Sequence, residues 1–253
     1  MRGLIKKSIK DTRVEPFFRW LVKRSRGISM PFDLVRNEIY DRQAFEVIER
    51  VLTTNSNAID VGCHRGQFLK EFLKHAQQGR HFAFEPIPHL ARTLQDQFPT
   101  VEVFPYALSS SSGEATFYII PDAPALSGLN ERDFVAQHKP RQEIKVRTQR
   151  LDDAIPRELK IDLIKIDVEG AEGLVISGAI DTIRRNKPYI ILEHGGASSR
   201  ALGFSSSDIY DILVEQCGLK ISLLKNWLHR ELSLTKQEFA RCSDWYFLAH
   251  RAT

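Results

Sequence analysis

Short apolar runs alternate with segments of helical periodicity along most of this chain. The apolar runs predict strands at 57–62, 81–85, 101–105, 161–167, 188–193, 219–224 and 244–250. Apolar residues recur at helical spacing over 41–52, 66–77, 88–97, 171–184 and 206–217. This alternation predicts an α/β fold with a doubly wound, mostly parallel seven-stranded sheet, whose ligands bind at the carboxyl ends of the strands. The last strand follows the sixth after a loop, so an antiparallel insertion is expected.

The region between the third and fourth strands departs from this alternation. Segments 114–120 and 143–151 alternate apolar and polar residues, which predicts a β-hairpin insertion. Segment 121–140 between them reads as a long loop, and loops of this length within a domain are usually functional or disordered. We expect this loop to lie over the ligand-binding edge of the sheet and to form part of an acceptor pocket.

Composition places the chain among ordinary globular proteins, with 42% hydrophobic and 27% charged residues in 253. We divide it into a basic, amphipathic helical extension at 1–52 and an α/β domain at 53–253. The three cysteines are widely spaced and form no C-x-x-C pair, so neither a disulfide framework nor a zinc site is expected. No apolar run approaches the ~20 residues of a membrane span, and Arg19 interrupts the one candidate for a signal-peptide core. We therefore expect a cytoplasmic protein.

Residues 1–26 concentrate positive charge, with nine basic residues against Asp11 and Glu15. Aromatic residues such as Phe17 and Trp20 are interleaved with these charges. One interpretation is an amphipathic helix that docks its aromatic residues on the main domain. The alternatives are peripheral contact with the anionic inner face of a membrane and, less favoured, contact with nucleic acid.

The stretch Ala58–Phe68 carries the first chemical signal. Its apolar run breaks at Gly62 and helical spacing begins after Gly66, as in a nucleotide-binding strand–turn–helix unit. The next strand ends at Glu85, where a carboxylate can accept both hydroxyls of a ribose. The spacing G-x-x-x-G differs from the G-x-G-x-x-G of dinucleotide binders, and Asp60 suits a ligand with an ammonium group better than a phosphate. These features favour S-adenosyl-L-methionine over NAD or ATP.

A second cluster of acidic residues follows the strand at 161–167. Asp167, Glu169 and Glu172 are expected near the carboxyl end of that strand, and Lys165 shares a strand face with Asp167. Three nearby carboxylates could stabilise a sulfonium, orient an acceptor hydroxyl or bind a divalent metal. For Glu172 the alternative is an interaction with the N-terminus of the following helix.

The chain resembles the FkbM methyltransferases over roughly residues 57–195. The resemblance lies in the segments Ala58–Phe68, Phe84-Glu85-Pro86, Ala107-Leu108-Ser109 with Gly113-Glu114, Leu151-Asp152-Asp153, and Ile164–Glu172. It implies a class I methyltransferase fold of Rossmann-like type and methyl transfer from S-adenosyl-L-methionine, generally to a hydroxyl oxygen. The cofactor-binding residues that we assign on this basis are Asp60, Gly62, His64, Gly66, Gln67, Phe68, Glu85, Pro86, Ala107 and Asp167.

Within the resemblance, each part of the cofactor has its own residues. Asp60, Gly62 and Gly66 would hold the methionyl part, Glu85 the ribose, and Ala107 would lie near the adenine. His64 stands where small or amide-bearing residues are common, so it is expected to crowd or contact the ligand's carboxylate.

The predicted function is an O-methyltransferase acting on a sugar, glycan or small natural product. The predicted catalytic residues are Asp167, His194 and Glu169, with His194 as the preferred general base and Asp167 as its competitor. A divalent metal on Asp167, Glu169 and Glu193 is not favoured. Two alternatives remain open, namely an RNA or protein methyltransferase guided by the basic N-terminal arm, and a non-catalytic cofactor-binding scaffold.

Overall fold

The computed structural model describes residues 32–121, 125, 127–129, 140–195 and 199–252. The chain divides into two compact units, residues 1–41 and 42–253, so the division falls within helix α3 (Phe32–Val51). The basic segment 1–26 lies outside the described residues, and its three interpretations remain predictions. The domain boundary expected at 52/53 also remains a prediction.

The second unit is built on a seven-stranded sheet in the order β3-β2-β1-β7-β8-β10-β9. Its strands are β1 (Ala58–Val61), β2 (His81–Phe84), β3 (Val101–Phe104), β7 (Leu163–Ile166), β8 (Tyr189–Glu193), β9 (Lys220–Leu223) and β10 (Tyr246–His250). Strands β3, β2, β1, β7 and β8 run parallel to one another, whereas β10 is antiparallel to both β8 and β9. This confirms the mostly parallel sheet and the antiparallel insertion of the last strand.

The central strands formed apolar runs in the sequence because they are covered on both faces. Every residue of β1, β2 and β7 is buried, as is usual for parallel strands between two layers of helices. The parallel register places Asp60 of β1 opposite Ala83 of β2 and Lys165 of β7. The order of the strands reverses at β1, because β2 and β3 lie on one side of it and β7 and β8 on the other. The crevice at such a switch point is the usual ligand site of an open α/β sheet.

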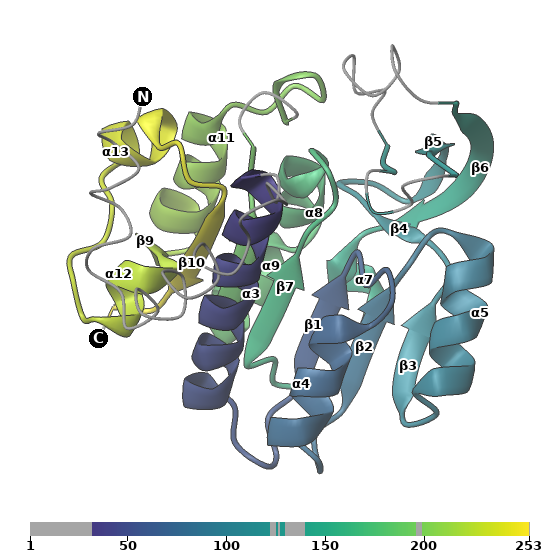
Figure 1. Ribbon diagram of the computed structural model, residues 1–253, viewed down its shortest axis with the longest axis horizontal. Helices are drawn as coiled ribbons and strands as arrows, with labels where there is room; N and C mark the ends of the chain where they lie inside the picture. Colours follow the sequence, from purple (N-terminus) through teal and green to yellow (C-terminus); the bar gives the residue numbers. More distant parts are fainter. Residues whose placement is uncertain (1–31, 122–124, 126, 130–139, 196–198, 253) are drawn as a thin grey trace, which may run out of the picture. The chain divides into compact units, whose positions relative to one another are not determined.

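A second, three-stranded sheet in the order β4-β6-β5 lies between β3 and β7 in the sequence. Strands β5 (Gly113–Ile119) and β6 (Gln142–Gln149) are antiparallel, and β4 (Ala107–Leu108) is parallel to β6. The two-residue strand β4 was not predicted. In Figure 1 this sheet lies on the same side of the unit as α5, and β9 and β10 lie on the opposite side.

The helices differ in detail from their predicted ranges. They are α4 (Gln67–His75), α5 (Pro88–Gln97), α7 (Leu151–Ala154), α8 (Glu172–Ser177), α9 (Ile180–Asn186), α11 (Ser206–Tyr210), α12 (Leu224–Leu228) and α13 (Lys236–Arg241), with a π-helical segment η2 (Asp211–Gln216) after α11. The single helix predicted at 171–184 is two helices separated at Gly178. A Cβ at Gly178 would lie 2.0 Å from the carbonyl oxygen of Ser109, so close packing of a distant segment explains the break.

Segment 121–140, predicted as a long loop, is described only in part. Gly128 forms an isolated antiparallel bridge with Tyr118 of β5. The Ser127 hydroxyl accepts a hydrogen bond from the backbone N–H of Ile120. A Cβ at Gly128 would lie 3.5 Å from the Cβ of Glu169. This part of the loop therefore reaches the carboxyl end of β7, as expected from its predicted position over the sheet edge.

Within the described ranges, no helix combines the length and the hydropathy needed to cross a lipid bilayer.

Candidate functional site

The loop after β1 brings two glycines into conformations that other residues adopt poorly. Gly62 has a φ of 80° and Gly66 a φ of 73°, both in the left-handed region that glycine enters without steric cost. A Cβ at Gly62 would lie only 1.9 Å from the backbone oxygen of Asp167. Glycine is thus required here both by conformation and by the close approach of the segment after β7.

Glu85 closes the other side of this loop from the end of β2. Its carboxylate accepts hydrogen bonds from the backbone N–H groups of His64, at 2.9 Å, and Ile87, at 3.0 Å. Burial raises the pKa of Glu85 to about 7, although the two N–H groups and Lys165 act in the opposite direction. A carboxylate buried in this way is prepared to accept further hydrogen bonds from a ligand.

The buried ammonium group of Lys165 links strands β1 and β7 at the crevice. The Nζ atom of Lys165 lies 3.5 Å from Oδ1 of Asp60 and 3.3 Å from Oδ2 of Asp167, and donates a 2.9 Å hydrogen bond to the carbonyl of Gly62. Burial alone lowers the pKa of Lys165, but the nearby carboxylates of Asp167 and Asp60 outweigh it and raise that pKa. Lys165 therefore remains charged. The prediction that Lys165 and Asp167 share a strand face is confirmed.

Some polar atoms of β1 and of the loop that follows it are buried without a hydrogen-bond partner among the described residues. They are both carboxylate oxygens of Asp60 and the Nε2 atom of His64. Buried polar atoms in native proteins are normally paired, so unpaired ones ask for an explanation such as a missing ligand. Next to the two glycines, these atoms fit a small polar ligand with both donor and acceptor groups.

Asp167 is the carboxylate of this cluster that reaches the open side of the crevice. Its side chain is 25% exposed, against 1% for Asp60 and 4% for Lys165. Its Oδ2 atom lies 3.5 Å from the hydroxyl of Tyr246, the first residue of β10. Burial and the charges of Asp167 and Glu169 raise the pKa of Glu193 well above its usual range, which favours its protonated form.

His194 and Glu172 belong to a separate buried network beside the crevice. One carboxylate oxygen of Glu172 accepts the N–H of Gly170 at 2.7 Å, and the other accepts the hydroxyl of Ser199 at 2.7 Å. The Nδ1 atom of His194 lies 3.1 Å from the Ser199 hydroxyl, and its Nε2 atom lies 2.8 Å from that of Ser206. His194 is only 4% exposed. Its geometry thus suits holding the adjoining turns in place better than meeting an acceptor, and its role as a base remains a prediction.

This network also shows where Glu172 points. The sequence placed Glu172 in one cluster with Asp167 and Glu169, but in the structure Glu193 occupies that position beside Asp167. Glu172 is the first residue of α8 and bonds the backbone just before it, as the helix-terminus interpretation predicted. Sequence reasoning missed Ser199 and Tyr246, whose strand and loop positions carried no signal of their own.

The other predicted residues lie on several neighbouring elements. Gln67 and Phe68 begin α4, and the Lys165 ammonium lies 5.1 Å from the centroid of the Phe68 ring. Pro86 follows Glu85 directly. Ala107 of β4 packs in a small apolar cluster with Ile87 and Phe117, and Glu169 adopts a left-handed conformation with a φ of 54°.

Within the described ranges, no group of three or more histidine, cysteine, aspartate or glutamate side chains is arranged so that it could coordinate a metal ion. The alternative of a metal on Asp167, Glu169 and Glu193 is therefore not supported there.

The strand order, the antiparallel β10 and the acidic crevice at the ends of β1, β2, β7 and β8 define a Rossmann-like domain of the class I methyltransferase type. Sequence comparison gives the family. The methyltransferase FkbM domain matches residues 60–221, more than half of the chain. The chain belongs to the FkbM methyltransferase family, as the motifs predicted.

Individual relatives share more limited similarity. The chain is 31% identical over 154 residues to the 2-O-methyltransferase NoeI of Sinorhizobium fredii, covering 54% of this chain and 62% of NoeI. It is 29% identical over 231 residues to the antimetabolite synthetase AmbE of Pseudomonas aeruginosa, covering 76% of this chain and 10% of AmbE. A crystal structure of methyltransferase FkbM from Methylobacillus flagellatus aligns with a TM-score of 0.49 at 16% identity, covering 79% of this chain and 44% of that one. The chain thus spans less than two thirds of these proteins.

Proposed function

We propose that this protein transfers a methyl group from S-adenosyl-L-methionine to a hydroxyl oxygen of a sugar, glycan or small natural product. The observation that carries this proposal is the pair of buried Asp60 oxygens that lack a hydrogen bond. They lie beside the glycine loop (residues 62–66), within a crevice that also contains Asp167 and Glu85. A crevice with more carboxylates than ammonium groups favours a cationic ligand. The bound cofactor would supply an electrophilic methyl group on a positively charged sulfur.

The residues of the crevice suit different parts of this cofactor. Asp60 and His64 offer a buried acceptor and a ring nitrogen for the amino acid end, and Gly62 and Gly66 leave space for it. Glu85 offers its carboxylate to the ribose hydroxyls, with Pro86 beside it. Gln67, Phe68 and Ala107 complete the walls. These roles are part of the proposal.

Asp167 is the residue that we assign to the acceptor. Its partly exposed carboxylate would accept a hydrogen bond from the acceptor hydroxyl and take its proton as the new C–O bond forms. Lys165 and Tyr246 fix the orientation of this carboxylate. Glu169, next to it in the turn, adds negative charge where the positively charged donor would be bound. His194, the general base preferred from the sequence, would hold the turn after β7 through Ser199 and Glu172, and it is the alternative to Asp167 as the base.

The class of acceptor is suggested by NoeI, whose name describes a 2-O-methyltransferase. That name supports oxygen as the methyl acceptor, and the sugar, glycan or small-molecule acceptor of this chain is our inference. We place the reaction in the cytoplasm. The basic arm, residues 1–26, has competing interpretations. It would contact the inner membrane face, or it would guide the protein to RNA or protein substrates.

The proposal is tested by calorimetric titration with S-adenosyl-L-methionine and with its neutral product S-adenosylhomocysteine. The unaltered chain should bind both, and Glu85→Ala should bind neither, because both ligands carry the ribose. Asp167→Asn should weaken the cationic donor more than the neutral product, because it removes a charge and keeps the shape. Equal weakening of both ligands would contradict the electrostatic argument, and unchanged binding in Glu85→Ala would overturn the ribose assignment. A chain that binds the donor but methylates no hydroxyl in glycan and metabolite extracts would support the scaffold alternative.

A further inference from the structure

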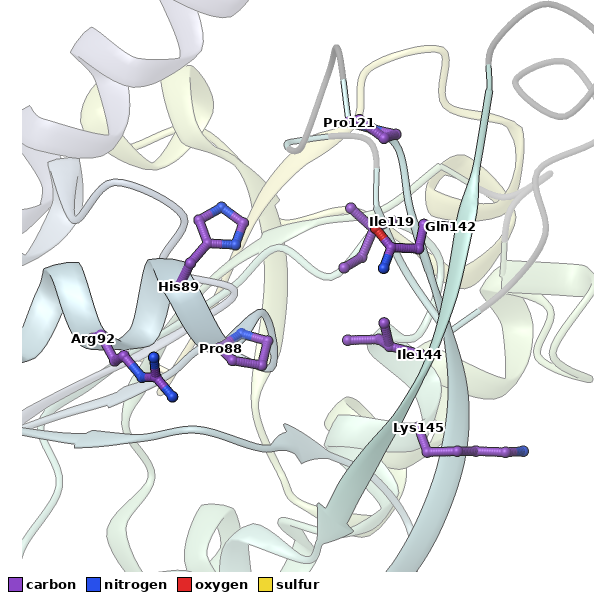
Figure 2. Close-up of a pocket in the computed structure, with 8 residues that line it drawn as sticks. All are labelled: Pro88, His89, Arg92, Ile119, Pro121, Gln142, Ile144 and Lys145. Carbon is purple, nitrogen blue, oxygen red and sulfur yellow. The ribbon is translucent and has the colours of Figure 1, made fainter.

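A pocket of about 490 Å³ opens between α5 and the small sheet, outside the crevice described above. Figure 2 shows residues of α5 on one side, and residues of β5 and β6 together with Pro121 on the other. The volume lies within the range of about 300–1,000 Å³ that is usual for small-molecule sites. This pocket has no assigned role in methyl transfer.

The floor of the pocket is apolar. Ile119 and Ile144 come from adjacent strands, where Ile119 is opposite Gln142 and Ile144 is opposite Phe117 in the antiparallel register. Directly opposite residues share a face of the sheet, so these side chains continue the apolar face that packs on Ile87. The floor would bind the apolar body of a ligand.

The rim toward α5 is positively charged. Arg92 is exposed, and within the described ranges it has no ion-pair partner. His89 lies one turn before it in α5, and both line the pocket. Helix α5 also begins at Pro88 without a side-chain cap or an acidic residue in its first turn. The partial positive charge of this helix terminus is therefore not compensated from those positions.

Lys145 lines the same pocket, but its ammonium group does not contribute to this charge. It donates a 2.8 Å hydrogen bond to the hydroxyl of Thr116, which lies opposite it on the outer face of the β5–β6 pair. Figure 2 shows its side chain extending away from the pocket. Lys145 thus provides a matched control, a cation in the same place that does not face the ligand.

From this combination we propose that the pocket binds a small amphiphilic anion, an organic phosphate or carboxylate with an apolar body. The anionic group pairs with the guanidinium of Arg92, which can bond a phosphate or carboxylate with two N–H groups. The Gln142 amide provides a further polar contact at the rim, and Ile119 and Ile144 contact the apolar body. The site is connected to the crevice because Pro88 follows Glu85 by only three residues, at most about 11 Å of chain.

The test uses the full chain and titrations followed by the backbone amide resonances of Gln142 and Ile144. The probes are phenyl phosphate, benzoate, inorganic phosphate and the neutral benzyl alcohol. The two aromatic anions should shift these resonances at lower concentration than inorganic phosphate or benzyl alcohol. The comparison of phenyl phosphate with benzoate decides which anion the site prefers. Arg92→Gln should weaken their binding about tenfold or more, and Arg92→Lys should weaken it less.

Two controls separate this site from general charge attraction and from the proposed function. Lys145→Gln should leave the dissociation constants unchanged, and Glu85→Gln should alter cofactor binding without abolishing the response to phenyl phosphate. Failure of both anions to shift these resonances would overturn the proposal. Equal weakening in Arg92→Gln and Lys145→Gln would also overturn it, because the binding would then follow overall charge.

Discussion

The glycine loop gives a sharp quantitative prediction, centred on Gly62→Ala. Two separate effects act at this residue. A φ of 80° places an added side chain in the left-handed region, which costs about 1–2 kcal/mol for an L-residue. The new Cβ would also lie 1.9 Å from the carbonyl oxygen of Asp167, and forced overpacking of this kind costs about 1–3 kcal/mol. We expect Gly62→Ala to lower the free energy of unfolding by about 2–5 kcal/mol.

Two other glycines separate the contributions. Gly203 has a φ of 84°, but no described atom lies within 4 Å of its added Cβ, so Gly203→Ala measures conformational strain alone. Gly79 has no left-handed φ, yet its Cβ would lie 1.8 Å from the carbonyl oxygen of Ser56. Gly79→Ala therefore measures steric overlap alone. The cost of Gly62→Ala should approach the sum of the two.

The assay is urea unfolding followed by circular dichroism, with calorimetric titration of S-adenosyl-L-methionine on each variant. Only Gly62→Ala should lose cofactor affinity, because Gly203 and Gly79 lie outside the crevice. If Gly62→Ala costs no more than Gly203→Ala, then the Asp167 carbonyl does not approach the loop as described, and the geometry of the site is wrong.

Three further predictions concern the buried charges. Lys165→Met should cost about 3–5 kcal/mol of stability, because it leaves the buried carboxylate of Asp60 and the partly exposed one of Asp167 without their cation. Adding Asp60→Asn should recover part of that loss. An equal cost in the single and double variants in urea unfolding would exclude the ion pair. The pKa of Glu85 rises from 4.5 to about 7 on folding. The folded state therefore binds this proton more readily than the unfolded state, and stability is lost as the pH rises between these values. Glu85→Gln should flatten this part of the pH–stability curve, and an unchanged curve would refute the assignment. Ser199→Ala should lower the free energy of unfolding by about 1–3 kcal/mol, because it leaves a buried carboxylate oxygen of Glu172 without a hydrogen bond. Ser199→Thr keeps the hydroxyl and should retain most of the stability. Thermal unfolding of the two variants tests whether the hydroxyl matters.

The sequence predicted the sheet well because its central strands β1, β2 and β7 are buried on both faces. Continuous apolar runs mark such strands, and the seven predicted ranges coincide with the seven observed strands to within a few residues. The break of the helix at Gly178 depends on the approach of Ser109 from a distant segment. That contact is a tertiary feature that helical periodicity does not contain. Strand β4 has only two residues, too few to form a pattern.

Candidate site residues were predictable where their position followed from the strand itself. Asp60, Glu85 and Asp167 stand at or next to the carboxyl ends of parallel strands, so the topology brings them to one edge. His194 also follows a strand, but its surroundings come from Ser199 and Ser206, after a turn whose course no sequence rule gives. Its burial could not be predicted for that reason.

The role of Lys165 explains how the crevice remains stable while it is ready for a ligand. A buried carboxylate beside a second, partly exposed one would be costly without a cation, and the Lys165 ammonium lies within 3.5 Å of both Asp60 and Asp167. Its ammonium group donates a hydrogen bond to the Gly62 carbonyl, and both Asp60 oxygens remain without a hydrogen bond in the described part of the chain. Lys165 thus stabilises the negative charge of Asp60, with its ammonium group 3.5 Å from Oδ1. An ammonium group of the ligand would find these acceptors already desolvated and oriented, because the folded chain has placed them there.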